Sequence, residues 1–302
     1  MNSIFYDAKV SDEERRQGLY DGQLYVYSPR PASIELCALA RELAKAAFAP
    51  HDPVLAQFHI PVEEFAAILS DLKPRFIHHP ECKRLLPQIF TELGCSLEKT
   101  YFDVPRLRTS TSDNFLTTGI SYAFHPHRDT WYSAPQCQLN WWIPVFDVVP
   151  ENVMAFHPHY WTHPVRNTSS VYNYAEWNRV SRYIASQQIG KDTRIQPKPQ
   201  EAMELDPQIR VVLPVGGILI FSGAQMHSTV PNTSGKTRFS IDFRTINLDD
   251  AHSRSGAPNV DSACSGTSLG DFLKAADLAK VPAELVAAYD TLPAQSDPAV
   301  PA

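Results

Sequence analysis

Three side chains of this sequence have the types and spacing of a metal site. His127 and Asp129 form an H-x-D triplet at the end of an aromatic-rich, strand-like segment, and residues i and i+2 of an extended chain point to the same side. His227 stands in a second strand-like segment and could close a three-ligand face. Two histidines and one carboxylate on one face leave the opposite positions of an octahedral metal open. This arrangement suits a non-haem Fe(II) that takes up a co-substrate and O2.

The spacing leaves alternative ligands open. His125 alternates with His127 and Asp129, so all three would share one face if the strand continues. Spacing alone does not decide which two of them bind metal. A second group of histidines lies further along the chain, without a carboxylate at a matching spacing, and consists of His157, His159 and His163.

Arg238 extends the predicted metal site to a metal-plus-dicarboxylate site. It begins the alternating segment R-F-S-I-D-F, whose apolar residues predict burial, and a buried guanidinium needs an anion. The planar guanidinium offers two parallel hydrogen bonds to a carboxylate. A small dicarboxylate that chelates the metal at one end and pairs with Arg238 at the other would satisfy both. The alternative is a structural ion pair of Arg238 with Asp242 or Asp147.

The elements that position these residues are predicted from periodicity. Alternation and β-forming residues predict strands at 23–27, 100–111, 120–127, 138–146, 153–156, 210–213, 218–221 and 238–246. Helical spacing bounded by Pro and Gly predicts helices at 32–48, 61–72, 83–93, 172–188 and 268–289. Many short strands are typical of a sandwich or barrel.

We therefore expect a mainly β fold with flanking helices. Residues 1–302 are expected to form a single domain. Its predicted parts are an N-terminal helical region at about 30–95, a strand-rich core at about 99–247, an insertion at about 165–208 and a C-terminal helix at about 268–290.

Composition excludes several classes of function. The chain is 43% hydrophobic and 20% charged, as in ordinary globular proteins, and its net charge of −6 argues against a general nucleic-acid binder. The five cysteines form no C-x-x-C pair and are expected to be reduced thiols. No apolar run approaches the roughly 18 residues of a membrane span, and no secretory signal is visible. We expect a cytoplasmic protein whose partner is a small molecule rather than nucleic acid or membrane. Its oligomeric state is not predicted.

The sequence resembles a known family at these motifs, the Fe(II)/2-oxoglutarate-dependent dioxygenases, particularly their phytanoyl-CoA dioxygenase-like branch. The resemblance is carried by H-R-D at 127–129, by the run G-G-I-L-I-F-S-G-A-Q-M-H that ends at His227, and by the offset from His227 to Arg238. It covers residues 20–30 and 100–246. The implied fold is a double-stranded β-helix, a cupin-like jelly roll, over the strand-rich core.

The resemblance also implies roles for single residues. His127, Asp129 and His227 would bind Fe(II), Arg238 would grip the distal carboxylate of 2-oxoglutarate, and the hydroxyl of Thr229 would assist. With O2, 2-oxoglutarate would be converted to succinate and CO2 while a C–H bond of the substrate is hydroxylated, desaturated or closed into a ring. Related halogenases carry a small residue at the position of Asp129, so halogenation is disfavoured.

Other residues are expected to contact the co-substrate or the substrate. Asn140 and Trp142 share a face of their strand, and we expect this face to look toward the co-substrate. Arg106 and Arg108 also share a face and could hold a substrate carboxylate or form a solvated surface. The five tryptophans gather between positions 131 and 177, where they either fill the core or line a site for a small, partly apolar molecule.

Trp131 and His157 are further candidates for substrate contact. The segment 151–158 departs from the family pattern, so the substrate is not assigned by analogy. The helix at 172–188 and the loop at 249–270 are candidates for a lid that excludes water. Two other functions stay open. A Zn or Fe hydrolase or isomerase on a cupin-like barrel would not need Arg238, and a non-catalytic jelly-roll binding protein would tolerate the loss of any ligand.

Overall fold

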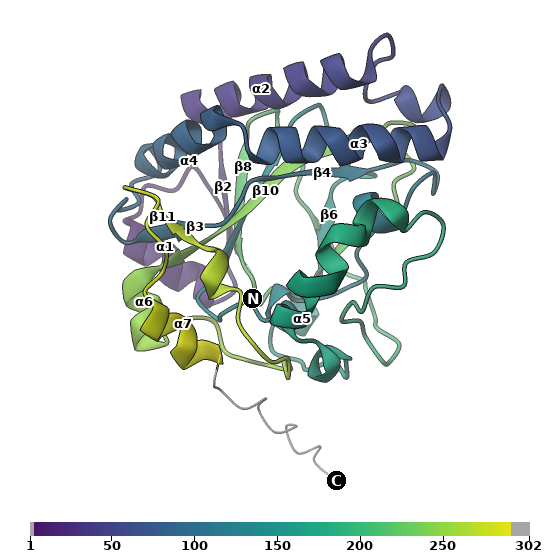
Figure 1. The fold of residues 1–302 in the computed structure, drawn as a ribbon. Helices are drawn as coiled ribbons and strands as arrows, with labels where there is room; N and C mark the ends of the chain where they lie inside the picture. The colour runs from purple at the N-terminus through teal and green to yellow at the C-terminus, as the bar shows by residue number, and fades with distance from the viewer. Residues whose placement is uncertain (1–2, 291–302) are drawn as a thin grey trace.

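The structure, a computed structural model, describes residues 3–290 and contains two β-sheets with flanking helices (Figure 1). The larger sheet has the order β1-β2-β8-β5-β10-β3-β11, and β4 pairs with β10 beside β3. Its strands are β1 (Ile4–Tyr6), β2 (Leu24–Tyr27), β3 (Thr100–Phe102), β4 (Arg106–Ser110), β5 (Leu139–Pro144), β8 (Ile218–Ser222), β10 (Arg238–Asn247) and β11 (Leu273–Lys274). The smaller, antiparallel sheet has the order β7 (Ile209–Arg210), β6 (Met154–Phe156) and β9 (His227–Thr229).

The long strand β10 divides its side chains between two environments. Phe239, Ile241 and Phe243 are fully buried in the main hydrophobic core. The alternate residues point to the other face, because successive side chains of a strand point to opposite sides, and they line an internal cavity: Arg238, Ser240, Asp242 and Arg244. This strand therefore joins the core to the site.

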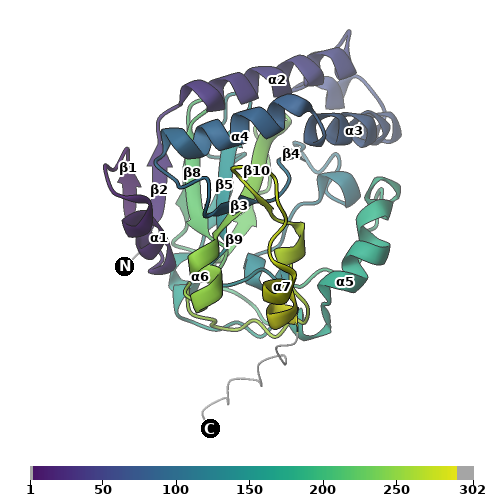
Figure 2. The ribbon, with the colours of Figure 1, turned by 60° about the vertical axis from the view of Figure 1, so that its left-hand side comes forward.

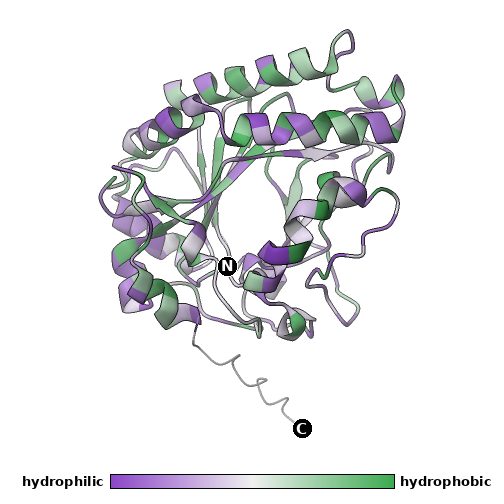
Figure 3. Ribbon diagram, in the orientation of Figure 1, coloured by the Kyte–Doolittle hydropathy of each residue, from purple (hydrophilic) through white to green (hydrophobic). Residues whose placement is uncertain are grey.

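Three helices cover the apolar face of the larger sheet, namely α2 (Pro31–Phe48), α3 (Val62–Ile77) and α4 (Pro80–Glu92) (Figures 1 and 2). The ring of Phe90 on α4 contacts those of Trp141 and Phe243, at centroid distances of 5.5 and 5.8 Å. The helices carry hydrophilic and hydrophobic residues along their length, as Figure 3 shows, so each buries one stripe and exposes the other.

The remaining helices are α1 (Asp12–Tyr20), α5 (Tyr174–Glu176), α6 (Leu248–Ser253) and α7 (Ala283–Asp290). Within residues 3–290, none of the helices has both the length and the apolar character that crossing a membrane requires. The sequence missed β1 and α1, although Ser11 and Glu14 form a capping box at the start of α1. That S-x-x-E signal was available in the sequence.

Two predicted elements are wrong. Residues 120–127 do not form a strand: Gly119–Ser121 is a 3-10 turn, and His127 makes only an isolated bridge with His227. Pro126 lacks the N–H that a ladder would use. The predicted helix at 268–289 is α-helical only in α7. Leu269–Asp271 forms a 3-10 turn, residues 273–274 pair instead with β3, and Pro282 precedes the start of α7.

Other predicted elements lie at the expected positions but differ from the prediction in their secondary structure. The strand predicted at 100–111 is divided by Pro105 into β3 and β4. The helix predicted at 172–188 consists of α5, a π-helical turn at Trp177–Ser181 and a 3-10 stretch at Arg182–Gln187. We call residues 174–187 the helical wall, because several of its side chains line the cavity.

Candidate metal centre and its cavity

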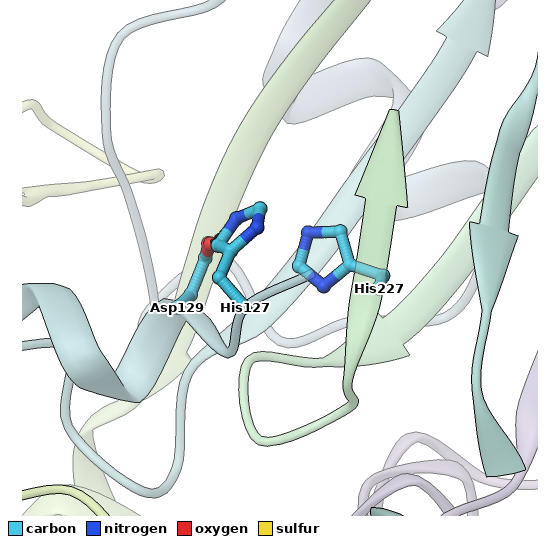
Figure 4. A group of neighbouring side chains, drawn as sticks. All are labelled: His127, Asp129 and His227. Atoms are coloured by element: carbon cyan, nitrogen blue, oxygen red, sulfur yellow. Dashed lines mark ion pairs between the residues drawn. The ribbon is translucent and has the colours of Figure 1, made fainter. Parts of the chain in front are cut away.

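His127, Asp129 and His227 come together as buried neighbours, and one ligand atom from each lies within 4.8 Å of the others (Figure 4). His227 begins β9, whereas His127 lies in the loop before the 3-10 turn Asp129–Tyr132. The backbone N–H of each histidine donates to the carbonyl of the other, at 2.9 Å in both directions. This reciprocal bridge sets the two imidazoles side by side, with ring centroids 4.3 Å apart.

Backbone carbonyls fix the ring nitrogen that each histidine offers. Nδ1 of His127 lies 2.8 Å from the carbonyl oxygen of His125, and Nδ1 of His227 lies 2.9 Å from that of Gln225. A carbonyl oxygen only accepts, so each Nδ1 carries the proton and each Nε2 presents its lone pair. Such orientation of ligating histidines by outer partners is typical of metal sites.

The carboxylate of Asp129 is oriented in the same way. Its Oδ2 accepts from Nδ2 of Asn140 at 3.0 Å, from Nε2 of Gln138 at 3.2 Å and from Nε of Arg244 at 3.4 Å. Its Oδ1 lies 3.5 Å from Nε2 of His127. One oxygen is therefore held by the protein, and the other faces the histidine nitrogens and is free to bind a cation.

Electrostatics keep Asp129 and His227 in the forms that bind metals. Burial alone would raise the pKa of Asp129, but Arg244 and the two histidines outweigh it and hold the pKa below its usual range. Burial, with His127 next, lowers the pKa of His227 to about 3. At neutral pH the site therefore has an ionised carboxylate beside a neutral His227 imidazole, as metal ligation needs.

The three ligands open onto a cavity of about 380 Å³, which is within the range of small-molecule sites, about 300–1,000 Å³. Residues of β4, β5, β9 and β10 line it, together with Lys73 of α3 and residues of the helical wall. The centre and the polar face of β10 thus share one cavity.

Arg238 lies in this cavity with donors that have no partner. Its side chain is buried, with Nη1 donating to the carbonyl of Asn152 at 2.9 Å and its guanidinium carbon 5.9 Å from the ring centroid of Trp142. Nε of Arg238, Oγ of Ser240 and Nε1 of Trp142 are buried without a hydrogen-bond partner among residues 3–290. Three orphaned buried donors on one wall are costly unless a ligand satisfies them. A carboxylate fits these donors.

The alternative ion pairs of Arg238 are not formed. No carboxylate of the described part of the chain makes an ion pair with it, and Asp242 pairs instead with Arg108, whose Nε lies 2.9 Å from Oδ1. Burial lowers the pKa of Arg238 to about 10, so the guanidinium stays charged at neutral pH.

The other residues predicted near the co-substrate also line the cavity. Asn140, Trp142 and Thr229 all do so. Asn140 uses its amide to hold Asp129, while Oγ1 of Thr229 accepts from the backbone N–H of Phe124 at 3.1 Å.

The four residues predicted to contact substrate divide into two pairs. Arg106 and Arg108 line the cavity, and both are half-buried. Trp131 and His157 are not among the residues that line the cavity, and their contact with substrate stays a prediction. Trp131 is fully buried and donates from Nε1 to Oδ1 of Asp261 at 2.7 Å. His157 packs behind β9, with Nε2 2.9 Å from Oγ of Ser228.

The alternative histidines do not join a metal site in the described chain. His125 is exposed. His159 and His163 stack at 4.2 Å between centroids, and Nδ1 of His163 lies 2.7 Å from the carbonyl of His159. Among residues 3–290, the one cluster with metal-binding geometry is His127, Asp129 and His227.

The loop at 249–270 is anchored through Asp261. Its Asp261 accepts from Nε of Arg128, from Nε1 of Trp131 and from the backbone N–H of Val165. These contacts attach the loop to Arg128 and Trp131, next to the metal ligands, and its role as a lid stays a prediction. The helical wall stays a lid candidate, and several of its residues line the cavity.

Sequence reasoning missed several residues of the site. Ser240 and Arg244 alternate with Arg238 along β10, so the period of two that placed Arg238 could have placed them too. Gln138 likewise alternates with Asn140. Lys73 carried no signal, because it belongs to a helix whose contact with the cavity depends on the tertiary fold.

Comparison with known proteins finds no matching family model and no matching curated protein. Solved structures do match, at low similarity. The apo form of the non-heme monooxygenase ThoJ is 14% identical, with a TM-score of 0.37, over 73% of this chain and 71% of that one. SnoN, an epimerase in complex with Fe3+, alpha-ketoglutarate and nogalamycin RO, is 15% identical, with a TM-score of 0.39, over 78% and 85% of the two chains.

EvdO2 from Micromonospora carbonacea var. aurantiaca, complexed with 2-oxoglutarate, is 12% identical, with a TM-score of 0.45, over 79% of this chain and 91% of its own. These neighbours are non-heme iron or 2-oxoglutarate proteins by their descriptions. At such TM-scores the likeness carries no weight for function, and the functional assignment rests on the residues of this chain.

Proposed function

We propose that this protein is an Fe(II)- and 2-oxoglutarate-dependent oxygenase that acts on a small organic molecule. The observation that supports it best is the pairing of two features in one cavity. A His–Asp–His face has both histidine Nε2 atoms available, and a wall with three orphaned donors centres on the charged Arg238. Metal binding alone would explain the His–Asp–His face but not the buried donors around Arg238.

The donor set fits both absent groups. His127, Asp129 and His227 would hold Fe(II), since imidazole and carboxylate ligands on one face suit this ion. Arg238, with Ser240 beside it on β10, would pair with the far carboxylate of 2-oxoglutarate through charge-assisted hydrogen bonds. When bound, iron, 2-oxoglutarate and O2 supply the oxidising power that releases succinate and CO2 and oxidises a C–H bond of the substrate.

The protein supplies orientation and exclusion of water. Gln138, Asn140 and Arg244 fix the outer oxygen of Asp129, so the carboxylate stays turned toward the histidines. The rings of Phe124 and Tyr132 pack against His127 at centroid distances of 5.0 and 5.4 Å and give the centre an apolar side. Both effects preserve ligand geometry in a low-dielectric site.

The finer family assignment belongs to the same proposal. The H-R-D triplet, the apolar run before His227 and the offset to Arg238 favour the phytanoyl-CoA dioxygenase-like branch. We also propose that the two sheets are the two halves of a double-stranded β-helix, with β9 and β10 bringing the second histidine and the arginine to its interior.

The proposal is tested by turnover of 2-oxoglutarate without substrate. Protein purified without oxygen and supplied with Fe(II), 2-oxoglutarate and air should form succinate slowly, because such turnover needs only the co-substrate site. Asp129→Ala should abolish it, and His125→Ala, which changes an exposed neighbour, should not. Equal succinate formation by Asp129→Ala and the unchanged protein would reject the proposal. Full activity with Zn(II) in a hydrolysis assay would favour the hydrolase alternative.

A further inference from the structure

A second basic group lines the same cavity as the donors around Arg238. It consists of Lys73 on α3 and of Arg106 and Arg108 on β4, and we call it the basic ledge. Arg106 and Arg108 share one face of their strand, opposite Asp242 and Ser240 of β10. The metal ligands and the orphaned donors do not use these three side chains.

Arg108 is positioned with most of its guanidinium available. Its Nε donates to Oδ1 of Asp242 at 2.9 Å, and its guanidinium carbon lies 5.5 Å from the ring centroid of Phe124. Neither Nη has a hydrogen-bond partner within residues 3–290, and the side chain keeps 34% of its surface exposed. A guanidinium held at Nε and stacked on a ring presents its remaining N–H groups as a planar fork for an oxyanion.

Arg106 and Lys73 add charge to the same place. Nη1 of Arg106 donates to Oδ2 of Asp103 at 2.6 Å, while the ammonium of Lys73 donates to the carbonyl of Ile120. Burial, followed by the charge of Arg108, lowers the pKa of Lys73 to about 7 although Asp242 opposes this. With Lys73 protonated, the ledge carries one positive charge more than Asp103 and Asp242 balance, because these carboxylates pair with Arg106 and Arg108.

A count of charges shows that the co-substrates do not supply the missing anion. The cations along this wall are Lys73, Arg106, Arg108, Arg238 and Arg244. The carboxylates are Asp103, Asp129 and Asp242. The excess along this wall is two positive charges (five minus three) when Lys73 is protonated and one when its amine is neutral; elsewhere in the lining Arg194 pairs with Asp192, and Asp271 accepts from the hydroxyl of Tyr174. Fe(II) and the 2-oxoglutarate dianion cancel, so the excess stays for a third ligand.

Aromatic rings connect the metal centre to the outer part of the cavity. Tyr132 contacts His127, and the ring of Tyr172 lies 5.4 Å from that of Tyr132 and 5.9 Å from that of Trp177. All four residues line the cavity. This row of rings, which we call the aromatic wall, offers apolar contact from a metal ligand to the helical wall, and large rings favour flat or apolar partners.

We propose that the substrate is an organic anion, with a carboxylate or phosphate held by the basic ledge and an apolar or aromatic body against the aromatic wall. The inference rests on the proposed function, because it treats the cavity beside the metal as the substrate site. Arg108 is the main anchor, since it has the most available N–H groups, and Lys73 and Arg106 complete the anion site. The carbon to be oxidised then lies between the ledge and the metal.

The test measures binding of matched probes by calorimetry to the protein loaded with Mn(II) and saturating 2-oxoglutarate. The probes are 3-phenylpropionate, its neutral amide and 2-phenylethyl phosphate, which share a ring and differ in the anionic group. At least one acid should bind, and the amide should bind at least about tenfold more weakly, because it lacks the charge-assisted hydrogen bonds. Tighter binding of 2-phenylethyl phosphate than of 3-phenylpropionate would indicate that the anionic group of the substrate is a phosphate.

Variants assign the binding to the ledge. Arg108→Gln and Lys73→Met should each weaken binding of the acid about tenfold or more and leave the amide unchanged. Arg108→Lys keeps the positive charge and should bind the acid more tightly than Arg108→Gln does, but more weakly than the unchanged protein. It also provides a test if Arg108→Gln does not fold. Arg75→Gln is the matched control, because Arg75 lies on the same helix as Lys73 but is 52% exposed and pairs with Asp71.

The two proposals can fail separately. Arg238→Gln should weaken 2-oxoglutarate binding about ten- to hundredfold and leave binding of the acid to the co-substrate-free protein intact. Failure of 2-oxoglutarate to bind the unchanged protein would contradict the proposed function alone. Equal binding of acid and amide, no binding of either acid, or full affinity in both Arg108→Gln and Lys73→Met would overturn the anion site.

Discussion

His127 and His227 are joined through their backbones, each N–H donating to the carbonyl of the other at 2.9 Å. The two residues lie far apart in the sequence, and this bridge is the contact that makes them neighbours. Because main-chain hydrogen bonds hold the positions of both rings, the ligand geometry is set by the fold before any metal binds. A preformed site loses little conformational entropy on metal binding.

The first prediction concerns the metal ligands. His227→Ala and Asp129→Ala should each weaken binding of Co(II) or Fe(II) by at least about a hundredfold, because a three-ligand face loses one of its charged or imidazole donors. Calorimetry with Co(II) measures this. His125→Ala removes the exposed histidine two residues before His127 and should bind metal normally. Loss of binding in His125→Ala with retention in His227→Ala would contradict the assignment.

The second prediction concerns the residue that orients Asp129. Asn140→Ala removes the 3.0 Å hydrogen bond to Oδ2 while leaving all three ligands in place. We expect metal affinity to fall about ten- to hundredfold, as for other outer partners of metal ligands. The melting temperature of the metal-free protein measures any general loss of stability. Unchanged metal affinity in a folded Asn140→Ala protein would show that Gln138 and Arg244 suffice.

The third prediction concerns the amine of Lys73. Burial and Arg108 lower its pKa to about 7. A lowered pKa means that the neutral amine appears above about pH 7, whereas an ordinary lysine, with a pKa of about 10.4, stays charged there. Acetylation should therefore modify Lys73 at pH 7.5 about tenfold or more faster than a typical surface lysine. Peptide mass spectrometry after brief exposure to acetic anhydride measures the rates. Slow labelling of Lys73 that rises only above pH 9 would contradict the shift.

The fourth prediction concerns stability. Arg128, the middle residue of the H-R-D triplet, is 1% exposed and pairs with Asp261 at 3.0 Å. Asp261→Asn keeps the shape of the side chain and leaves the guanidinium buried without its anion. Breaking a buried pair in this way costs about 3–5 kcal/mol of the free energy of unfolding. Urea denaturation at neutral pH measures it. A loss below about 1 kcal/mol, as is typical of exposed pairs, would show that the loop at 249–270 is not an anchor.

The sequence predicted the parts of the site that follow from local periodicity and from the family resemblance. The placement of Arg238 follows from alternation along one strand, and β10 preserves that alternation from Arg238 to Arg244. The sharing of a face by Asn140 and Trp142 has the same origin, and both line the cavity. In each case a single element decides the direction of the side chain.

The differences came from residues whose direction depends on other parts of the chain. Trp131 and His157 have the right types for a substrate site, but they bond to Asp261 and Ser228 and are not among the residues that line the cavity. Lys73 was missed because the packing of α3 across the sheet, rather than its sequence, brings its amine to the cavity. The strand predicted at 120–127 failed because Pro126 interrupts it and His127 pairs only with His227.

The most direct test of the central claim is the absorption spectrum of the protein mixed with Fe(II) and 2-oxoglutarate without oxygen. Chelation of the metal by 2-oxoglutarate gives a weak visible metal-to-ligand charge-transfer band, which should appear in the unchanged protein and be absent in Asp129→Ala. In Arg238→Gln it should require about ten- to hundredfold more 2-oxoglutarate, since the charge-assisted pair is lost. No band in the unchanged protein, or a band in Arg238→Gln at the same 2-oxoglutarate concentration as in the unchanged protein, would contradict the account.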